Sequence, residues 1–205
     1  ARVTGVKAVV TAVAGLGSIF IKQDFKGKFI LSLLYPLFKI AFGHFNQKII
    51  VQNKDDKKWL IDWGVLKSSK TCLIKGSGVD LLKFSSLKEK KGLPIVCLVA
   101  RLLKHKGIFE FISASKLLGQ RGIKARFWLV GDIDPGNPSS LIKEDLDNIK
   151  KNTKIELKGF VKNISSILAK SHIVCLPSYR EGLSLTLIEA SAAGRSIVTT
   201  NTPGC

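Results

Sequence analysis

A cluster of basic residues follows an apolar segment near the middle of the chain. The run VARLLKHKG begins at Val99 and places Arg101, Lys104 and Lys106 directly after a strand-like pattern. Gly107 precedes a helical pattern, so these cations are expected beside a helix start. Helix N-termini and nearby cations attract phosphate oxygens, and an arginine fork with a mobile lysine charge suits a diphosphate. The segment indicates a phosphate site; an ordinary solvated basic loop is the alternative interpretation.

A second cluster, PSYREGLSLTLIEA at 177–190, carries two carboxylates. Glu181 follows an apolar strand pattern, and Gly182 lets the backbone pass close to a ligand. Glu189 lies eight residues after Glu181, which is about two turns if a helix starts at once. A carboxylate inside an apolar helix needs a hydrogen-bonding partner, and a ribose diol supplies two hydroxyls. The alternative is an ordinary surface glutamate.

The elements that position these residues are short apolar runs that alternate with helical patterns. This alternation predicts parallel sheets that are covered on both faces. The carboxyl ends of parallel strands line one crevice, so both clusters are expected at one mouth. We expect strands near Val6–Val13, Lys48–Gln52, Thr71–Lys75, Pro94–Ala100, Ala125–Val130, Ile155–Leu157, His172–Leu176 and Ser196–Thr200. We expect helices near Lys28–Phe42, Asp55–Trp63, Gly107–Gln120, Ser139–Lys151, Ile164–Lys170 and Leu183–Ala193.

A polar, charged stretch divides the chain. FSSLKEKK at 84–91 follows a turn-rich segment and precedes Gly92 and Pro94, which is typical of a linker between two α/β units. We therefore expect one domain over 1–85 and a second over 86–205. Both ends look cut from within a longer protein.

The chain is strongly basic. It has 33 Lys and Arg against 15 Asp and Glu, a net charge of +18. Such an excess suits nucleic acid, anionic lipid or phosphorylated substrates, unless it reflects only a lysine-rich composition. Nucleic acid is disfavoured because aromatic residues do not alternate with the lysines. Three of the four cysteines lie in apolar runs, which fits a reducing compartment.

The most apolar long stretch, FILSLLYPLFKIAFGHF at 29–45, is too short to span a membrane, and Pro36 and Lys39 interrupt it. An ordinary buried helix is the expectation. The alternative is an interfacial segment that suits a lipid-linked acceptor and is flanked by Lys22, Lys26, Lys28 and Lys39. Trp59 and Trp63, four residues apart, are expected to pack together on one helix face.

Several segments in order carry a family resemblance. ARLLKHKG, LVGD, KGF, LPSYREGLSLTLIEA and IVTTNTPG resemble the C-terminal domain of glycosyltransferase family 4, whose E-x7-E signature matches Glu181 and Glu189. GSGVD at 76–80 resembles the turn before the interdomain linker. VAGLGSIF, VQNKDD and LVGDIDPGNP resemble a subgroup that adds sugars to polyprenyl-diphosphate-linked oligosaccharides in bacterial glycan synthesis. Where the family often has glycine, this chain has Ala100.

The resemblance implies an α/β fold of the GT-B type, with two Rossmann-like domains that are both truncated in this chain. It implies catalytic roles for Arg101, Lys106 and Glu181, with the two cations on the donor diphosphate and Glu181 on the sugar ring. Glu189 would bind the ribose hydroxyls. The further donor-binding residues would be Phe160 and Val161 near the base and the amides of Gly182, Leu183 and Ser184.

The function implied is a retaining transfer of a hexose or N-acetylhexosamine from a nucleotide sugar, UDP-linked, to a lipid-linked glycan in bacterial surface polysaccharide synthesis. No cofactor and no metal are expected, and Asp132 and Asp134 are interpreted as turn-forming residues before Pro135. The expected place is the cytoplasm, with peripheral contact to the anionic inner face of the plasma membrane. The alternatives are a basic α/β binding module and an inactive glycosyltransferase fragment.

Overall fold

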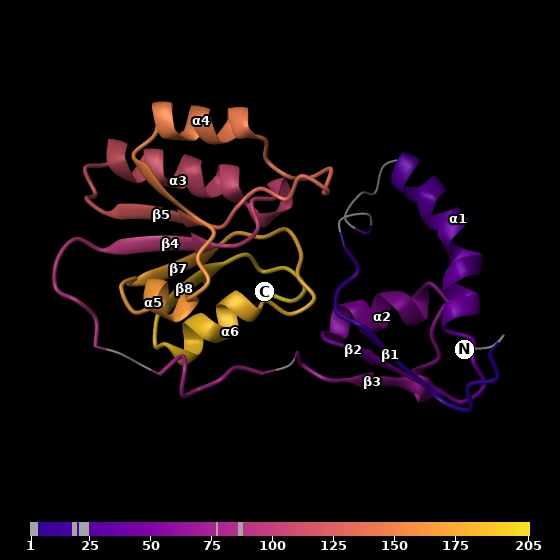
Figure 1. The fold of residues 1–205 in the computed structure, drawn as a ribbon. Helices are drawn as coiled ribbons and strands as arrows, with labels where there is room; N and C mark the ends of the chain where they lie inside the picture. Colours follow the sequence, from indigo (N-terminus) through magenta and orange to yellow (C-terminus); the bar gives the residue numbers. More distant parts are fainter. Residues whose placement is uncertain (1–3, 18–19, 21–24, 77, 86–87) are drawn as a thin grey trace. The chain divides into compact units, whose positions relative to one another are not determined.

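The computed structural model describes residues 4–17, 20, 25–76, 78–85 and 88–205. The chain forms two compact units, each built on its own sheet (Figure 1). The first unit is Ala1–Ser77 with Arg180–Ser184 and Thr202–Cys205. The second is Gly78–Tyr179 with Leu185–Asn201.

The first unit contains a three-stranded parallel sheet in the order β1-β2-β3. Its strands are β1 (Val9–Val13), β2 (Gln47–Val51) and β3 (Thr71–Leu73), and its helices are α1 (Phe25–Ala41), α2 (Lys54–Asp62) and the 3₁₀ helix η2 (Ser68–Lys70). Helix α2 begins after Asn53, whose side chain accepts a hydrogen bond from the Asp56 amide at 2.7 Å. The core includes Trp59 and Trp63, whose ring centroids lie 4.9 Å apart. The predicted packing of these two rings is confirmed.

Helix α1 confirms the helix expected near Lys28–Phe42, and it continues through Pro36 to Ala41. Its burial differs from the expectation. One face carries Phe38, which packs against the first core. The opposite face leaves Phe29, Leu33 and Leu37 about 60% exposed, at 59%, 58% and 60%. The expectation of an ordinary buried helix therefore fails for this face. Lys22, one of the expected flanking cations, lies outside the described residues.

The second unit contains a five-stranded parallel sheet in the order β6-β5-β4-β7-β8, as the alternating pattern predicts. Its strands are β4 (Ile95–Val99), β5 (Arg126–Val130), β6 (Ile155–Gly159), β7 (Ile173–Leu176) and β8 (Ser196–Thr199). Its helices are α3 (Ile108–Gln120), α4 (Lys143–Asn152), α5 (Ile164–Leu168), α6 (Leu185–Ala192) and the 3₁₀ helix η3 (Lys104–Lys106).

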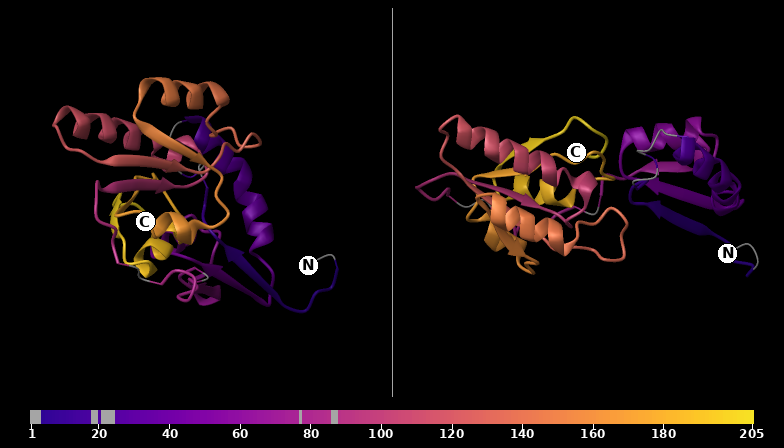
Figure 2. Two further views of the ribbon diagram at one scale, coloured as in Figure 1. Left: turned by 60° about the vertical axis from the view of Figure 1, so that its left-hand side comes forward. Right: turned by 90° about the horizontal axis from the view of Figure 1, so that it is seen from above.

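Two layers of helices cover this second sheet. Helices α3 and α4 lie on one face and α5 and α6 on the other, a layering that can be followed in Figures 1 and 2. Phe111 of α3 packs with Leu98 and Leu129 in one core cluster. Leu168 of α5 packs with Cys97 and Val174 in the other. Burial on both faces explains why these strands read as continuous apolar runs.

The strand order reverses between β4 and β7. From β4 the chain proceeds outward through β5 and β6, and it then returns to add β7 on the other side of β4. In open parallel sheets, ligands bind outside the carboxyl ends of the strands at such a reversal. The loops that follow β4 and β7 are therefore the expected site.

The division between units falls earlier than the composition suggests. It lies between Ser77 and Gly78, whereas the sequence places the domain boundary after residue 85. Phe84 is only 4% exposed, and Val79 packs against the same cluster in the second unit. Two positions of the expected linker, Ser86 and Leu87, lie outside the described residues.

No helix in the described parts of the chain has the length and apolar character that a membrane crossing requires.

Candidate active site

The loop after β4 carries the first two candidate residues. Backbone hydrogen bonds from Ala100 N to Val130 O and from Leu102 N to Asp132 O, both 3.0 Å, fasten the beginning of this loop to the end of β5. Arg101 points outward between these two anchors, with 65% of its side chain exposed. Lys106 ends η3, and its side chain is partly exposed.

Gly107 brings the end of η3 against the exit of β7. Its φ of 75° lies in the left-handed region that favours glycine. A Cβ atom there would lie 2.1 Å from the carbonyl oxygen of Pro177. Tyr179 N donates to His105 O at 2.9 Å, and the Ser178 hydroxyl donates to the same oxygen at 3.2 Å. The loops that leave β4 and β7 are thus held together, as the strand reversal predicts.

Arg101 has an ion-pair partner that sequence patterns did not indicate. Its Nη1 lies 2.8 Å from Oδ2 of Asp134. Asp134 was interpreted as a turn residue, and its carbonyl oxygen does accept a turn hydrogen bond from Asn137 N at 2.8 Å. Its carboxylate has the additional role of holding the Arg101 guanidinium. The Asp132 carboxylate accepts a hydrogen bond from the next residue in the same loop, Ile133 N, at 2.8 Å. Within the described residues, no group of three His, Cys, Asp or Glu side chains could hold a metal ion.

Glu189 lies on α6, which starts later than expected. The helix begins at Leu185, four residues after Glu181. The two-turn argument that placed both carboxylates on one helix side is therefore wrong, because Glu181 precedes the helix. At the start of α6, Thr186 Oγ1 donates to Val99 O at the end of β4 at 3.2 Å. Glu189 follows three residues later, on the same side of the helix as Thr186.

Glu189 is half-buried on α6. Burial raises the pKa of its carboxyl group, and the charge of Lys83 partly opposes this effect. Leu187 and Ala190, its neighbours on α6, are both buried. Among the described residues, none donates a hydrogen bond to the Glu189 carboxylate. A half-buried carboxylate of this kind is ready to accept hydrogen bonds from ligand hydroxyls.

The segment from Glu181 to Ser184 groups with the first unit. Asn53 Nδ2 donates to Gly182 O at 2.6 Å, and a Cβ at Gly182 would lie 1.7 Å from Ala14 O. The close approach that Gly182 permits is thus to the protein's own backbone. The Ser184 amide donates to Gly204 O at 3.0 Å. The expected contacts of the Gly182, Leu183 and Ser184 amides with ligand oxygens stay predictions.

A buried ion pair supports this segment, and sequence reasoning missed it. Arg180 Nη2 contacts Asp56 Oδ1, and the side chains are 16% and 1% exposed. The two residues lie 124 positions apart in the chain. No local pattern signals such a pairing, although an aspartate in the first turn of α2 is itself a common helix-start feature.

Phe160 and Val161 follow β6 and have different environments. Phe160 is 76% exposed, whereas Val161 packs against the second-unit core that contains Trp128. Gly131 N donates to Gly159 O at 2.9 Å, which joins the ends of β5 and β6. Phe160 therefore stands free to contact a ligand at the carboxyl edge. The Val161 side chain is partly buried because it packs against that core.

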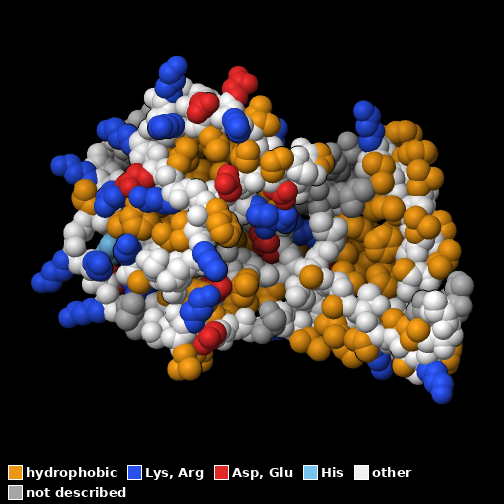
Figure 3. Space-filling view, in the orientation of Figure 1, with side chains coloured by type: hydrophobic (Ala, Val, Ile, Leu, Met, Phe, Trp, Pro, Cys, Tyr) orange, Lys and Arg blue, Asp and Glu red, His pale blue; other side chains and the backbone are white. Residues whose placement is uncertain are grey.

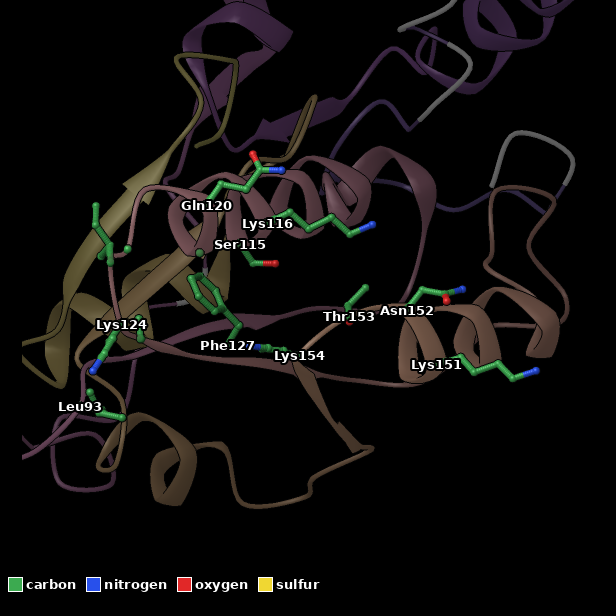
Figure 4. Close-up of a pocket in the computed structure, with 14 residues that line it drawn as sticks. Leu93, Ser115, Lys116, Gln120, Lys124, Phe127, Lys151, Asn152, Thr153 and Lys154 are labelled. Carbon is green, nitrogen blue, oxygen red and sulfur yellow. The ribbon is translucent and has the colours of Figure 1, made fainter.

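A cavity of about 950 Å³ lies at the opposite edge of the second sheet. Figure 4 shows Phe127 between the ends of α3 and α4, with Lys116, Lys124, Lys151 and Lys154 around the opening. Its lining includes Leu93, which lies just before β4, and Ala125, which directly precedes β5. Because the strand reversal directs ligands to carboxyl ends, we do not assign the candidate active site to this cavity.

Known proteins with similar sequences are glycosyltransferases. The chain is 35% identical over 206 residues to the N,N'-diacetylbacillosaminyl-diphospho-undecaprenol alpha-1,3-N-acetylgalactosaminyltransferase of Campylobacter jejuni subsp. jejuni, covering 94% of this chain and 52% of the relative. It is 30% identical to the Escherichia coli UDP-Gal:alpha-D-GlcNAc-diphosphoundecaprenol alpha-1,3-galactosyltransferase, covering 100% of this chain and 54% of the relative. The chain thus spans about half the length of these curated relatives.

Solved structures show the same fold. The Anabaena protein HepE in complex with UDP superposes with a TM-score of 0.73 at 18% identity, covering 96% of this chain and 54% of that one. WaaG, a glycosyltransferase involved in lipopolysaccharide biosynthesis, gives 0.72 at 15% identity, covering 99% and 62%. The expected α/β architecture of the GT-B type is confirmed. The family described as Glycosyl transferases group 1 matches residues 81–205, and the chain belongs to this family.

Proposed function

We propose that the protein transfers a hexose or N-acetylhexosamine from a UDP-sugar to a lipid-linked glycan in bacterial surface polysaccharide synthesis. The two relatives described above are named for transfer to undecaprenol-diphosphate-linked sugars, and one is named for a UDP-linked donor. Family membership supports the reaction class. The donor and acceptor remain part of the proposal because the chain spans only about half of each relative.

The observation that carries the proposal is the half-buried Glu189 beside the strand reversal. Its carboxylate lies one helical turn beyond Thr186, which is bonded to the end of β4. The loop that leaves this same strand end carries Arg101 and Lys106. A half-buried carboxylate and two cations therefore lie on neighbouring segments of the second unit. A nucleoside diphosphate has ribose hydroxyls that suit the carboxylate and phosphates that suit the cations.

In the proposed reaction, Arg101 and Lys106 bind the donor diphosphate and offset the charge that develops on the departing UDP. No metal and no cofactor take part, because these two cations supply the countercharge. Glu189 accepts hydrogen bonds from the ribose hydroxyls, and Phe160 with Val161 lies near the base. Glu181 contacts the transferred sugar, with the amides of Gly182, Leu183 and Ser184 nearby. The transfer retains the anomeric configuration.

The protein is proposed to act in the cytoplasm, in peripheral contact with the anionic inner face of the plasma membrane. The exposed face of α1 supports this part of the proposal (Figure 3). Phe29, Leu33 and Leu37 offer apolar surface, and Lys28 and Lys39 lie on the same helix. Apolar side chains beside lysines are the combination that places a helix at a membrane interface.

The test uses the full-length protein, a panel of UDP-sugars and a pool of polyprenyl-diphosphate-linked acceptors. Mass spectrometry would detect an acceptor that gains one hexose or N-acetylhexosamine, and the anomeric NMR signal would report retention. Arg101→Ala and Glu189→Ala should each weaken UDP binding by about tenfold or more. Unchanged UDP affinity in both variants would refute the site. Absence of any sugar transfer across the panel would refute the function.

A further inference from the structure

Basic side chains gather at the amino-terminal edge of the second sheet, opposite the candidate active site. They appear along the left-hand margin of this unit in Figure 3. A cavity of about 620 Å³ opens within this surface. Its cationic lining residues are Lys90, Lys91, Arg126, Lys158 and Lys170. None of the residues described as lining this cavity is acidic.

One carboxylate, which is not among the residues that line the cavity, pairs with two of these cations. Glu156 receives Arg126 Nε at 2.7 Å and Nη2 at 2.9 Å, and its Oε2 lies 2.8 Å from Lys158 Nζ. Parallel pairing of Trp128 with Glu156 sets this arrangement on adjacent strands. The hydrogen bond from Arg126 is the main cause that lowers the pKa of Glu156 to about 2. The carboxylate is therefore charged at neutral pH.

The indole ring of Trp128 lies beneath the same two cations. The Arg126 guanidinium carbon lies 5.5 Å from the ring centroid, and Lys158 Nζ lies 4.6 Å from it. Both are within the range of cation–π attraction. The indole is 6% exposed, so it orients the cations and offers little surface to a ligand. Two charged groups are thus pre-positioned before any ligand arrives.

His172 fixes the backbone on the other side of the cavity. Its Nδ1 accepts from Ile95 N at 3.0 Å, so the ring proton is on Nε2. That Nε2 donates to Lys90 O at 2.8 Å. The segment that carries Lys90 and Lys91 is therefore tied to the beginnings of β4 and β7. The cationic rim is anchored on both sides.

The charge balance defines the ligand. Five cations and the single carboxylate of Glu156 give this cluster a net charge of +4. Like charges at close range repel, and an anion of matching charge relieves that repulsion. The oxygen atoms of a phosphate suit lysine ammonium groups and an arginine edge. We propose that this cavity binds a multiply charged phosphate group, such as a diphosphate, at a site separate from the donor crevice.

The test is calorimetric titration of the full-length protein with pyrophosphate, in the presence of saturating UDP to fill the donor crevice. Lys158→Gln/Lys170→Gln removes two charges from the cavity. Lys143→Gln/Lys150→Gln removes two from α4, outside the cavity lining, as the matched control. The cavity variant should lose affinity about tenfold or more, and the control less than twofold.

Two results would overturn the proposal. One is the absence of saturable pyrophosphate binding while UDP is bound. The other is an equal loss in the cavity and control variants, which would show only the effect of net charge. If the double cavity variant melts below wild type, Lys170→Gln alone is measured, because within the described part of the chain the Lys170 side chain makes no hydrogen bond or ion pair.

Vesicles distinguish a lipid-borne phosphate from a soluble one. Phosphatidic acid vesicles, which present a phosphomonoester, and phosphatidylcholine vesicles are compared in a flotation assay with the same variants. Selective loss of phosphatidic acid binding in the cavity variant identifies lipid headgroups as the source. Pyrophosphate binding that depends on the cavity, with vesicle binding unaffected, identifies a soluble ligand. Both outcomes support the site.

Discussion

Gly107 lies directly against Pro177: a Cβ at residue 107 would sit 2.1 Å from the Pro177 carbonyl oxygen. This contact joins the loop that carries Lys106 to the loop that precedes α6. It requires both the left-handed φ of Gly107 and the absence of a side chain. The site's geometry therefore depends on a residue that has no chemistry of its own.

Gly107→Ala should destabilise the protein and displace η3. The left-handed backbone disfavours alanine, and the added methyl overlaps backbone atoms that cannot move away easily. We expect a loss of about 2–4 kcal/mol in the free energy of unfolding, measured by urea denaturation. Gly136→Ala is the control, because no heavy atom lies within 4 Å of its added Cβ. Equal stability of the two variants would contradict the tight contact.

Glu189→Gln should make the unliganded protein more stable at pH 7 while weakening donor binding. Burial raises the pKa of Glu189, so the folded state favours its protonated form. The cost of the ionised form is absent below the ordinary carboxyl pKa and grows as pH rises through the folded-state value. Removal of the charge abolishes this cost but weakens the hydrogen bonds from ribose, with an expected affinity loss of about tenfold.

Thermal denaturation from pH 4 to pH 8 and UDP calorimetry measure the two effects of Glu189→Gln. The gain in melting temperature should increase with pH. Asp147→Asn, an exposed change on α4, controls for the loss of one negative charge. A variant that is destabilised at pH 7 would show that the Glu189 carboxylate has a stabilising partner.

Asp134→Asn should strengthen UDP binding slightly. The Arg101 guanidinium faces Asp134 at 2.8 Å, and a diphosphate must compete with that carboxylate. Because the pair is exposed, the gain should be only about two- to fivefold, with little change in thermal stability. Calorimetric titration with UDP measures it. Weaker binding would instead mean that Asp134 orients Arg101 for the diphosphate.

The four cysteines should separate into two pairs by reactivity. Among the described residues none of them forms a disulfide, and Cys72 and Cys205 are exposed. Burial raises the pKa of both Cys97 and Cys175 to about 11, so little thiolate forms at neutral pH. Iodoacetamide at pH 7.5 should label Cys72 and Cys205 first, with peptide mass mapping as the measurement. Fast labelling of Cys97 in the folded protein would contradict its burial in the second core.

Glu156→Gln should affect stability only modestly, and the effect should depend on acid pH. The bond from Arg126 lowers the pKa of Glu156 to about 2, so its stabilising contribution is present above the ordinary carboxyl pKa. That contribution is lost as pH falls from about 4 towards about 2. Since the side chain is 34% exposed, we expect at most about 1 kcal/mol at pH 7. Urea denaturation at pH 7 and pH 2.5 tests whether the difference disappears in acid.

Continuous apolar runs were sufficient to locate the strands. β4 was expected over Pro94–Ala100 and occurs at Ile95–Val99, because a buried parallel strand needs apolar side chains on both faces. The start of α6 was misplaced by two residues. The periodic spacing of LSLT suggests a helix from Leu183, but the Ser184 amide bonds to Gly204 instead. A long-range contact overrode a local pattern.

The partners of the site residues could not be predicted in the same way. Asp134 lies 33 residues from Arg101, and their pairing depends on how the loops after β4 and β5 approach one another. The exposed face of α1 was missed for a related reason. Its apolar residues indicate burial, and only the structure shows which face contacts the core.

Main-chain bonds tie the exits of three neighbouring strands: Ala100 N to Val130 O, and Gly131 N to Gly159 O. Such bonds join main-chain atoms, so they do not depend on most of the side chains that project from the loops beyond them. A substitution at an outward-facing position such as Phe160 can therefore alter molecular recognition without repacking the interior. This separation offers a route by which related proteins could diversify their preferences while keeping one scaffold.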